Sequence, residues 1–386
     1  MTMRDPGHLA VHTVEVSGRP LVPAPLERGD RLVVMGDRDD VSHVLERAAA
    51  LPGTAVVPAP DGARRLSVTA YLRRIAGSGT PQQEPEPVDP DRALDAFGLS
   101  YDRLRRTRLS ELGADASVRL HLAAALVSGA QWPILDNPFA GLPGDLRAGV
   151  RGRLLGVCEE FGLGLVLASN DLLDAATTGG TTVVVEKGQV ADAGELAAML
   201  RNPRSNLAAS FAGVNVFSGL ARRGWLSIGH SQVRARTELD GKVFVTIPTD
   251  ATTMSFDEFD PVFIAETVFE ALIVGIRDRG GRLQIVVSPS DTEVGLAMTA
   301  DVLDFRSLPA DPARREPGPG SSAEAPTASG TEAPTASGTE CSPQWGVLHP
   351  GLGATVAETL SNVRVGARVH IEVDTSRMHA YPVEVD

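Results

Sequence analysis

The spacing of apolar residues changes once along this chain, and that change constrains the fold more than any other feature. Up to about residue 205, short apolar runs alternate with segments of helical periodicity. From about Val214 the helical periodicity fades, and short strands separated by turn residues take over. The first pattern predicts an α/β domain with a largely parallel sheet, and the second predicts an all-β domain.

A length of 386 residues exceeds one ordinary domain, so we expect one domain over residues 1–205 and a second over 206–386. In the first domain, strands are expected at 31–35, 132–135, 164–168 and 182–185. Helices are expected at 41–51, 117–127, 146–161 and 193–200. In the second domain, strands are expected at 225–228, 243–247, 271–276 and 283–287.

One segment of the second domain has a biased composition. Residues 308–345 are rich in Pro, Ala, Ser, Gly and Glu, and the octad EAPTASGT occurs twice in tandem, at 324–331 and 332–339. Such a segment cannot bury enough apolar surface to offset the entropy of ordering. We expect a disordered loop between β strands.

Charge, cysteine content and hydropathy exclude several classes of protein. The net charge of −13 argues against a nucleic-acid or anionic-membrane partner. Cys158 and Cys341 support neither a disulfide framework nor a zinc site, and no metal site is expected. The sequence has no apolar run of signal-peptide length and none that could span a membrane, which predicts a cytoplasmic protein.

Several segments follow one another in an order that is typical of one family. Residues 133–142 read PILDNPFAGL, 165–171 read LVLASND, and 182–194 fit a closing hairpin. Residues 202–214 fit a domain junction, and 373–382 fit a last β strand. The chain therefore resembles the ATP-binding subunit of molybdate-type ABC importers. The resemblance implies a P-loop NTPase-like ABC domain followed by an OB-like TOBE, or molybdate-binding-like, β domain.

The phosphate-binding loop of that family is degenerate here. The family motif Gly-x-x-x-x-Gly-Lys-Ser/Thr cradles phosphate in backbone N–H groups and neutralises it with the lysine. Here Gly36 is followed by Asp-Arg-Asp-Asp-Val-Ser at 37–42, with Val41 at the lysine position. Three aspartates would repel a triphosphate. Gly36 and Ser42 remain, and a helix N-terminus there could hold a smaller anion. ATP and Mg²⁺ are not expected to bind, and no other cofactor is assigned.

The catalytic positions of the family are also altered. The metal-binding aspartate is retained as Asp136, but Asn137 replaces the catalytic glutamate and Asn170 replaces the switch histidine. An amide cannot accept a proton from attacking water, and such general-base assistance is worth about 10²–10⁴-fold. Pro143 replaces a further aspartate of the family. These changes predict a chain that does not hydrolyse ATP.

The signature loop of the family aligns with residues 112–116, where Asp115 replaces a glycine and no hydroxyl remains. A carboxylate at that position would again repel phosphate. Arg119 keeps the basic position of the family, and we expect it to lie on a solvated helix face. No glutamine is found where the glutamine loop should lie.

The second domain offers polar residues that could bind an oxyanion in the manner that the resemblance implies. The candidates are Thr375, Ser376, Arg377, Thr299 and Ser288. Asp374 lies where the family often has a lysine, and its charge is unfavourable beside a dianion unless an arginine compensates. Molybdate or a similar oxyanion therefore stays open as a ligand.

The favoured interpretation is a pseudo-ATPase: a non-hydrolysing regulatory or structural partner linked to oxyanion transport. We expect a homodimer, or a heterodimer with an ABC ATPase subunit, and a membrane permease subunit is a further candidate partner. The protein would then lie in the cytoplasm or peripherally at the inner face of the cell membrane. Two alternatives stay open. One is a functional importer ATPase subunit in a composite dimer, and the other is a small-oxyanion binding or sensing protein.

Overall fold

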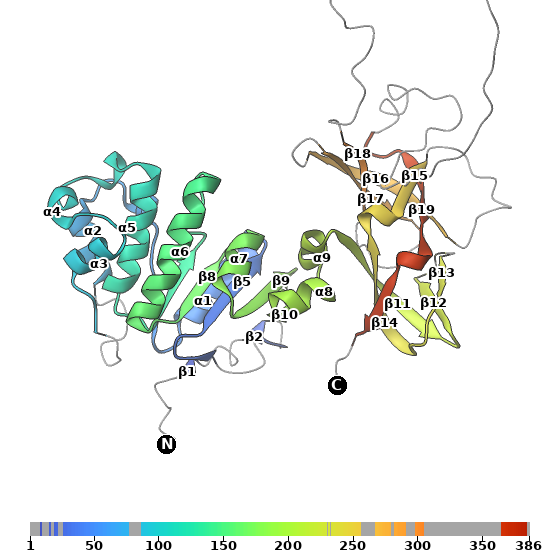
Figure 1. Ribbon diagram of the computed structural model, residues 1–386, viewed down its shortest axis with the longest axis horizontal. Helices are drawn as coiled ribbons and strands as arrows, with labels where there is room; N and C mark the ends of the chain where they lie inside the picture. Colours follow the sequence, from blue (N-terminus) through green and yellow to red (C-terminus); the bar gives the residue numbers. More distant parts are fainter. Residues whose placement is uncertain are drawn as a thin grey trace, which may run out of the picture. The chain divides into compact units, whose positions relative to one another are not determined.

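The computed structural model divides the chain into two compact units, unit 1 over residues 1–212 and unit 2 over residues 213–386 (Figure 1). The structure describes residues 8–9, 15–16, 19–21, 26–76, 86–229, 231, 233–255, 267–278, 282–290, 298–304 and 364–383. The segment 308–345, expected to be a disordered loop, lies outside the described residues.

Unit 1 is built on a six-stranded sheet in the order β10-β9-β5-β8-β7-β6. Its strands are β5 (Arg31–Gly36), β6 (Thr54–Val56), β7 (Trp132–Asp136), β8 (Leu165–Ala168), β9 (Thr181–Glu186) and β10 (Gln189–Glu195). All neighbours pair in parallel except β10, which forms an antiparallel hairpin with β9. The described residues also form two short pairs, β1 (His8–Leu9) with β4 (Leu26–Glu27) and β2 (Glu15–Val16) with β3 (Arg19–Pro20).

Helices cover both faces of this sheet. They are α1 (Arg38–Ala49), α2 (Val68–Ile75), α3 (Pro90–Ala96), α4 (Tyr101–Leu104), α5 (Ala114–Val127), α6 (Gly144–Phe161), α7 (Leu172–Thr178), α8 (Leu196–Arg201) and α9 (Asn206–Ala212). Alternate residues of β5 enter different cores: Leu32 and Val34 pack with α1, and Val33 and Met35 pack with α5 and α6. A strand buried on both faces needs a continuous apolar run, which is why residues 32–35 lack polar side chains.

Two element boundaries in unit 1 differ from the expectation. Helix α1 begins at Arg38, before the expected start at Val41, so the residues expected to form a degenerate phosphate loop are largely helical. The helix expected from Ala193 begins at Leu196, because Ala193 pairs with Val183 in the β9–β10 hairpin. Strand pairing overrides the weak helical propensity of these residues.

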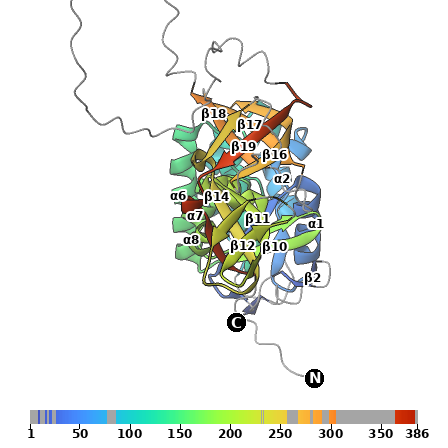
Figure 2. The same cartoon turned by 90° about the vertical axis from the view of Figure 1, so that its right-hand side faces the viewer.

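Unit 2 contains two five-stranded antiparallel sheets (Figures 1 and 2). The first, in the order β13-β12-β11-β14-β20, consists of β11 (Val214–Arg222), β12 (Trp225–Ile228), β13 (Arg234–Arg236), β14 (Gly241–Pro248) and β20 (His379–Pro382). The second, in the order β15-β19-β16-β17-β18, consists of β15 (Thr252–Ser255), β16 (Val268–Asp278), β17 (Arg282–Pro289), β18 (Met298–Asp304) and β19 (Arg368–Val373).

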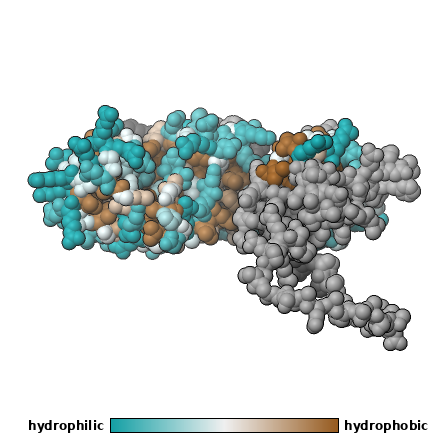
Figure 3. All heavy atoms as spheres, turned by 90° about the horizontal axis from the view of Figure 1, so that it is seen from above, coloured by the Kyte–Doolittle hydropathy of each residue, from teal (hydrophilic) through white to brown (hydrophobic). Residues whose placement is uncertain are grey.

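Side chains from both sheets of unit 2 share one core, where Phe217 of β11 stacks on Phe269 of β16 with ring centroids 5.7 Å apart. The expectation of an α/β domain followed by an all-β domain is confirmed, and the two antiparallel sheets are compatible with an OB-like domain. In the face drawn in Figure 3, hydrophilic residues of unit 1 are interspersed with hydrophobic ones. Among the described residues, no helix is long and apolar enough to cross a membrane.

Candidate functional site

Three neighbouring strands of unit 1 end at one edge of the sheet, here called the carboxyl edge. It comprises Gly36–Asp37 after β5, Asp136–Asn137 after β7 and Ser169–Asn170 after β8. The N–H of Ser169 donates to the carbonyl of Val34 at 3.1 Å, and the N–H of Asn137 donates to that of Ala168 at 2.9 Å. Ligands of α/β proteins bind at the carboxyl ends of parallel strands. The structure therefore brings the candidate catalytic residues together where a nucleotide site is expected.

The connection between β5 and α1 is too short for a phosphate-binding loop. Asp37 alone separates the end of β5 from the start of α1, and its carbonyl already accepts the helical N–H of Val41 at 2.9 Å. A phosphate loop needs several consecutive non-helical residues whose N–H groups point at the anion. One residue cannot supply them.

Side chains at the start of α1 are also unsuited to a triphosphate. Val41, at the lysine position, is buried in the core that α1 forms with the sheet, so no cation lies there. Ser42, the residue after Val41, is partly buried. Asp37 and Asp39 are exposed, whereas the carboxylate of Asp40 accepts the N–H of Gly188 in the β9–β10 turn at 2.9 Å. The aspartates thus leave two exposed negative charges at the carboxyl edge.

Gly36 and Asn170 form a closed polar contact at the end of β5. The N–H of Gly36 donates to Oδ1 of Asn170 at 2.8 Å, and Nδ2 of Asn170 donates to the carbonyl of Gly36 at 2.7 Å. Gly36 has a φ of +149°, and a Cβ there would lie 2.2 Å from the carbonyl oxygen of Val185 in β9. Both residues therefore have a structural role. The glycine allows β5 to approach β9, and the asparagine forms hydrogen bonds with the backbone N–H and carbonyl at the end of β5.

The end of β7 is open to solvent. Asp136 and Asn137 are exposed, and within the described part of the chain neither side chain makes a hydrogen bond. Asn137 has a φ of +46°, a left-handed conformation that asparagine tolerates better than most residues. Its carbonyl accepts the N–H of Ala140 at 3.1 Å, which closes a turn. Asn137, the residue next to Asp136, carries an amide and cannot act as a general base.

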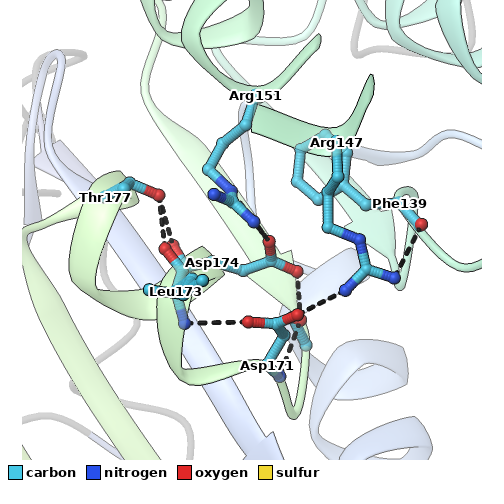
Figure 4. A network of polar contacts seen from close by, with 8 residues as sticks. Phe139, Arg147, Arg151, Asp171, Leu173, Asp174 and Thr177 are labelled. Carbon is cyan, nitrogen blue, oxygen red and sulfur yellow. Dashed lines mark hydrogen bonds and ion pairs between the residues drawn. The ribbon is translucent and has the colours of Figure 1, made fainter. Parts of the chain in front are cut away.

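A buried ion pair joins α6 to α7 next to Ser169 of the carboxyl edge (Figure 4). The sequence did not predict it. One carboxylate oxygen of Asp174 in α7 accepts Nε and Nη2 of Arg151 in α6 at 2.8 and 2.5 Å. The other oxygen accepts the hydroxyl of Ser169 at 2.6 Å. The two charged side chains are only 6% and 1% exposed. This network fixes α6, α7 and the end of β8 relative to one another.

A second ion pair lies closer to solvent, between Arg147 of α6 and Asp171 (Figure 4). Arg147 also donates to the carbonyl of Phe139 at 3.2 Å, and Asp171 accepts the N–H of Leu173 at 2.8 Å. Burial raises the pKa of Asp171, but these hydrogen bonds and the Arg147 charge outweigh it, and the net pKa is lowered. The sequence does carry a signal, since Arg147 and Arg151 lie one helical turn apart and so face the same side.

His121 of α5 is a further residue that the sequence analysis missed. It is 3% exposed, and its Nε2 lies 2.7 Å from the carbonyl of Val57. Burial lowers the pKa of His121, although the hydrogen bond to Val57 and the carboxylates of Asp136 and Asp61 act in the opposite direction. A neutral imidazole that donates to a carbonyl is a satisfied core group. Nothing in the local sequence distinguishes it from an apolar helix position.

The segment that aligns with the family's signature loop forms the start of α5. Gly113 is the N-cap, and the helix begins at Ala114. Asp115 binds Nε of Arg119 at 2.9 Å, and Nη1 of Arg119 donates to the carbonyl of Phe97 at 3.2 Å. The expectation of a solvated Arg119 is wrong, because the side chain is partly buried and bridges α5 to the end of α3.

The oxyanion candidates of unit 2 occupy two places. Thr375, Ser376 and Arg377 form a 3₁₀ turn between β19 and β20, whereas Ser288 lies in β17 and Thr299 in β18. A carboxylate oxygen of Asp374 accepts the N–H and hydroxyl of Ser376 at 3.0 and 2.6 Å. Arg377 binds Asp250 at 2.8 Å. Ser376 and Arg377 therefore already bind carboxylates. Among the described residues, no cluster of His, Cys, Asp and Glu could hold a metal ion.

Comparisons with known proteins place relatives of the chain among importers. No protein-family model matches. The molybdenum import ATP-binding protein ModC of Mycobacterium tuberculosis is 36% identical over 109 residues, 28% of this chain and 30% of that protein. The molybdate/tungstate import ATP-binding protein WtpC of Pyrococcus horikoshii is 24% identical over 194 residues, 50% of this chain and 56% of that protein.

Solved structures were also compared with the chain. A nucleotide-free ATP-binding cassette from an ABC transporter aligns with a TM-score of 0.38 and 14% identity, covering 47% of this chain and 88% of that one. The sequence matches span between about a third and just over half of the length of the two importer proteins. The chain is homologous to the ATP-binding proteins of importers, molybdenum and molybdate importers among them.

Proposed function

We propose that this chain is a non-hydrolysing relative of importer ATP-binding subunits, with a regulatory or structural role. The observation that carries the proposal is the direct passage from β5 through Asp37 into α1, which leaves no loop to cradle phosphate. Without such a loop, the nucleotide has no backbone donors for its β- and γ-phosphates.

Three further features at the carboxyl edge support the proposal. Val41 is buried where a cation would neutralise the phosphates. The amide of Asn170 is engaged with the backbone of Gly36, so it is not directed at a nucleotide. Asn137 cannot act as a general base toward water. Each change alone would slow an ATPase, and together they remove phosphate binding, charge neutralisation and base catalysis.

The proposed partners follow from the relatives, which are named as import ATP-binding proteins. We propose that the chain pairs with a second copy or with a competent ATPase subunit, at an importer's membrane subunit. Unit 2 would be a TOBE-like domain that makes regulatory contacts. Oxyanion binding by the turn at 375–377 is not part of the proposal, because Asp374 and Asp250 already bind Ser376 and Arg377.

Phosphate release by the purified full-length chain with Mg²⁺ and ATP tests the proposal. We expect no rate above that of the Asp136→Ala variant, which lacks the one retained acidic residue of the catalytic set. The Asn137→Glu variant should also be inactive, because restoring a base does not restore phosphate binding. Turnover by the wild-type chain that Asp136→Ala abolishes would contradict the proposal, since such activity must come from this chain.

A further inference from the structure

The first sheet of unit 2 exposes a basic face that the proposed function does not use. Side chains of a strand point alternately to opposite faces, and directly opposed residues on neighbouring strands share a face. One row across the sheet is Arg222, Trp225 and Arg236, and the next is Lys242, Leu220, Ser227 and Arg234. Residues of the opposite face, such as Leu226 and Val243, are buried in the core. The rows lie on strands β13, β12, β11 and β14, which neighbour one another in that order (Figure 1).

The centre of this face is apolar and open to solvent. Trp225 is 41% exposed and Leu220 is 47% exposed. Aromatic side chains and arginines dominate the binding energy of protein interfaces, where an apolar centre is surrounded by a polar rim. Trp225 and Leu220 lie diagonally on neighbouring strands, with cations at both ends of their rows, and this matches that arrangement.

Arg236 and Trp225 hold each other in place. The guanidinium carbon of Arg236 lies 3.8 Å from the centroid of the Trp225 ring, which is a cation–π contact. Stacking restricts both side chains before a partner arrives, which lowers the entropy lost on binding. The arginine keeps in-plane donors that can bind a carboxylate while it stacks.

The charge of the face opposes that of the chain. The whole chain has a net charge of −13, yet Arg222, Arg236 and Lys242 are exposed, and none of them forms an ion pair with another described residue. The nearest acidic residues in sequence, Glu238 and Asp240, lie in the connection after β13. Cations that have no ion-pair partner among the described residues, arranged around an apolar centre, complement a partner of the opposite charge.

We propose that this face binds a partner protein through a segment in which carboxylates flank an aromatic or aliphatic side chain. The apolar side chain would pack on Trp225 and Leu220, and the carboxylates would bind Arg222, Arg236 and Lys242. Nucleic acid fits less well, because the overall negative charge repels a polyanion and because Arg236 already covers one face of the only aromatic ring in these two rows.

Fluorescence anisotropy with the full-length chain tests this proposal. The probe is a short fluorescein-labelled peptide in which glutamates alternate with phenylalanines, and the matched probe carries glutamines in place of the glutamates. We expect saturable binding of the glutamate peptide alone. The Arg222→Glu/Arg236→Glu variant and the Trp225→Ala variant should each weaken it at least about tenfold, corresponding to the loss of a central contact.

Arg368→Glu is the control, because Arg368 is an exposed arginine of β19 in the other sheet. It should bind the peptide like the wild type, and unchanged thermal unfolding should show that all variants fold. The proposal would be overturned by no saturable binding, by equal loss in Arg368→Glu, or by tighter binding of single-stranded oligothymidylate than of the glutamate peptide. Self-association of the chain that Arg236→Glu abolishes would also overturn it, by assigning the face to a second copy.

Discussion

At the scale of single residues, Asn170 and Gly36 close the end of strand β5. The amide of Asn170 both accepts from and donates to the backbone of Gly36, at 2.8 and 2.7 Å. A histidine at position 170, as in the resembled family, has one donor and one acceptor on different sides of a ring and cannot form this paired contact. The amide of Asn170 therefore has a structural role at the end of β5.

Removal of the Asn170 amide should destabilise unit 1. Asn170→Ala leaves a backbone N–H and a carbonyl unpaired, and we expect the free energy of unfolding to fall by about 1–3 kcal/mol. Urea denaturation measures it. Asn170→His should also lose stability without gaining ATPase activity. Asn137→Gly is the control, since Asn137 is exposed in a left-handed conformation that glycine adopts freely, and an equal loss there would contradict the assigned role.

The buried His121 predicts a specific dependence of stability on pH. Because burial lowers its pKa in the folded chain, the unfolded chain binds a proton first as the pH falls below about 6.5. The contribution of His121 to stability is therefore complete above that pH and is lost below it, by up to about 1.4 kcal/mol per pH unit.

His121→Gln provides the comparison, because glutamine can still donate to the carbonyl of Val57 but does not titrate. The free energy of unfolding, measured by urea denaturation between pH 8 and 5, should fall more steeply for the wild type than for the variant. Parallel profiles for the two proteins would show that His121 is protonated equally in the folded and unfolded states.

At the scale of elements, the sequence predicts the strands and helices of unit 1 well, but not the connections that decide function. The apolar run at 31–35 is long enough to identify a buried strand, and β5 follows. The early start of α1 was missed because acidic residues are common both in loops and in the first turn of a helix, as Asp39 and Asp40 are here. Helix α8 begins later than predicted because Ala193 pairs with Val183 in the β9–β10 hairpin. That pairing depends on residues outside the helical pattern.

The polar network that joins α6 to α7 depends on residues distant in sequence. Arg151→Met should leave Asp174 buried without its cation and should lower the free energy of unfolding by about 3–5 kcal/mol. The double variant Arg151→Met/Asp174→Leu should lose less, because no buried charge is left unpaired. Chemical denaturation of both variants gives the comparison.

Arg147→Met is the matched control on the same helix. The pair Arg147–Asp171 is 25% and 30% exposed, so we expect a loss of about 0–1 kcal/mol. A loss for Arg147→Met as large as that for Arg151→Met would show that burial does not distinguish the two ion pairs.

At the scale of the whole molecule, the change of periodicity near residue 205 was sufficient to predict an α/β unit followed by an all-β unit. The order of motifs also predicts a resemblance to importer ATP-binding proteins, to which the chain is homologous. The structure adds what the candidate residues do: Asn170 and Gly36 hold β5, Asp40 holds a turn, and Arg119 bridges two helices. Such roles could not be predicted, because each depends on a tertiary partner at least twenty residues away in the sequence.

We propose that unit 1 does not bind a nucleotide at its carboxyl edge, because β5 passes through Asp37 alone into α1. Equilibrium binding of a fluorescent ATP analogue to the full-length chain, with and without Mg²⁺, tests it most directly. We expect no saturable Mg²⁺-dependent binding up to millimolar analogue. Saturable binding that unlabelled ATP displaces, and that Asp136→Ala weakens, would contradict it, because the carboxyl edge would then hold the nucleotide without a phosphate loop.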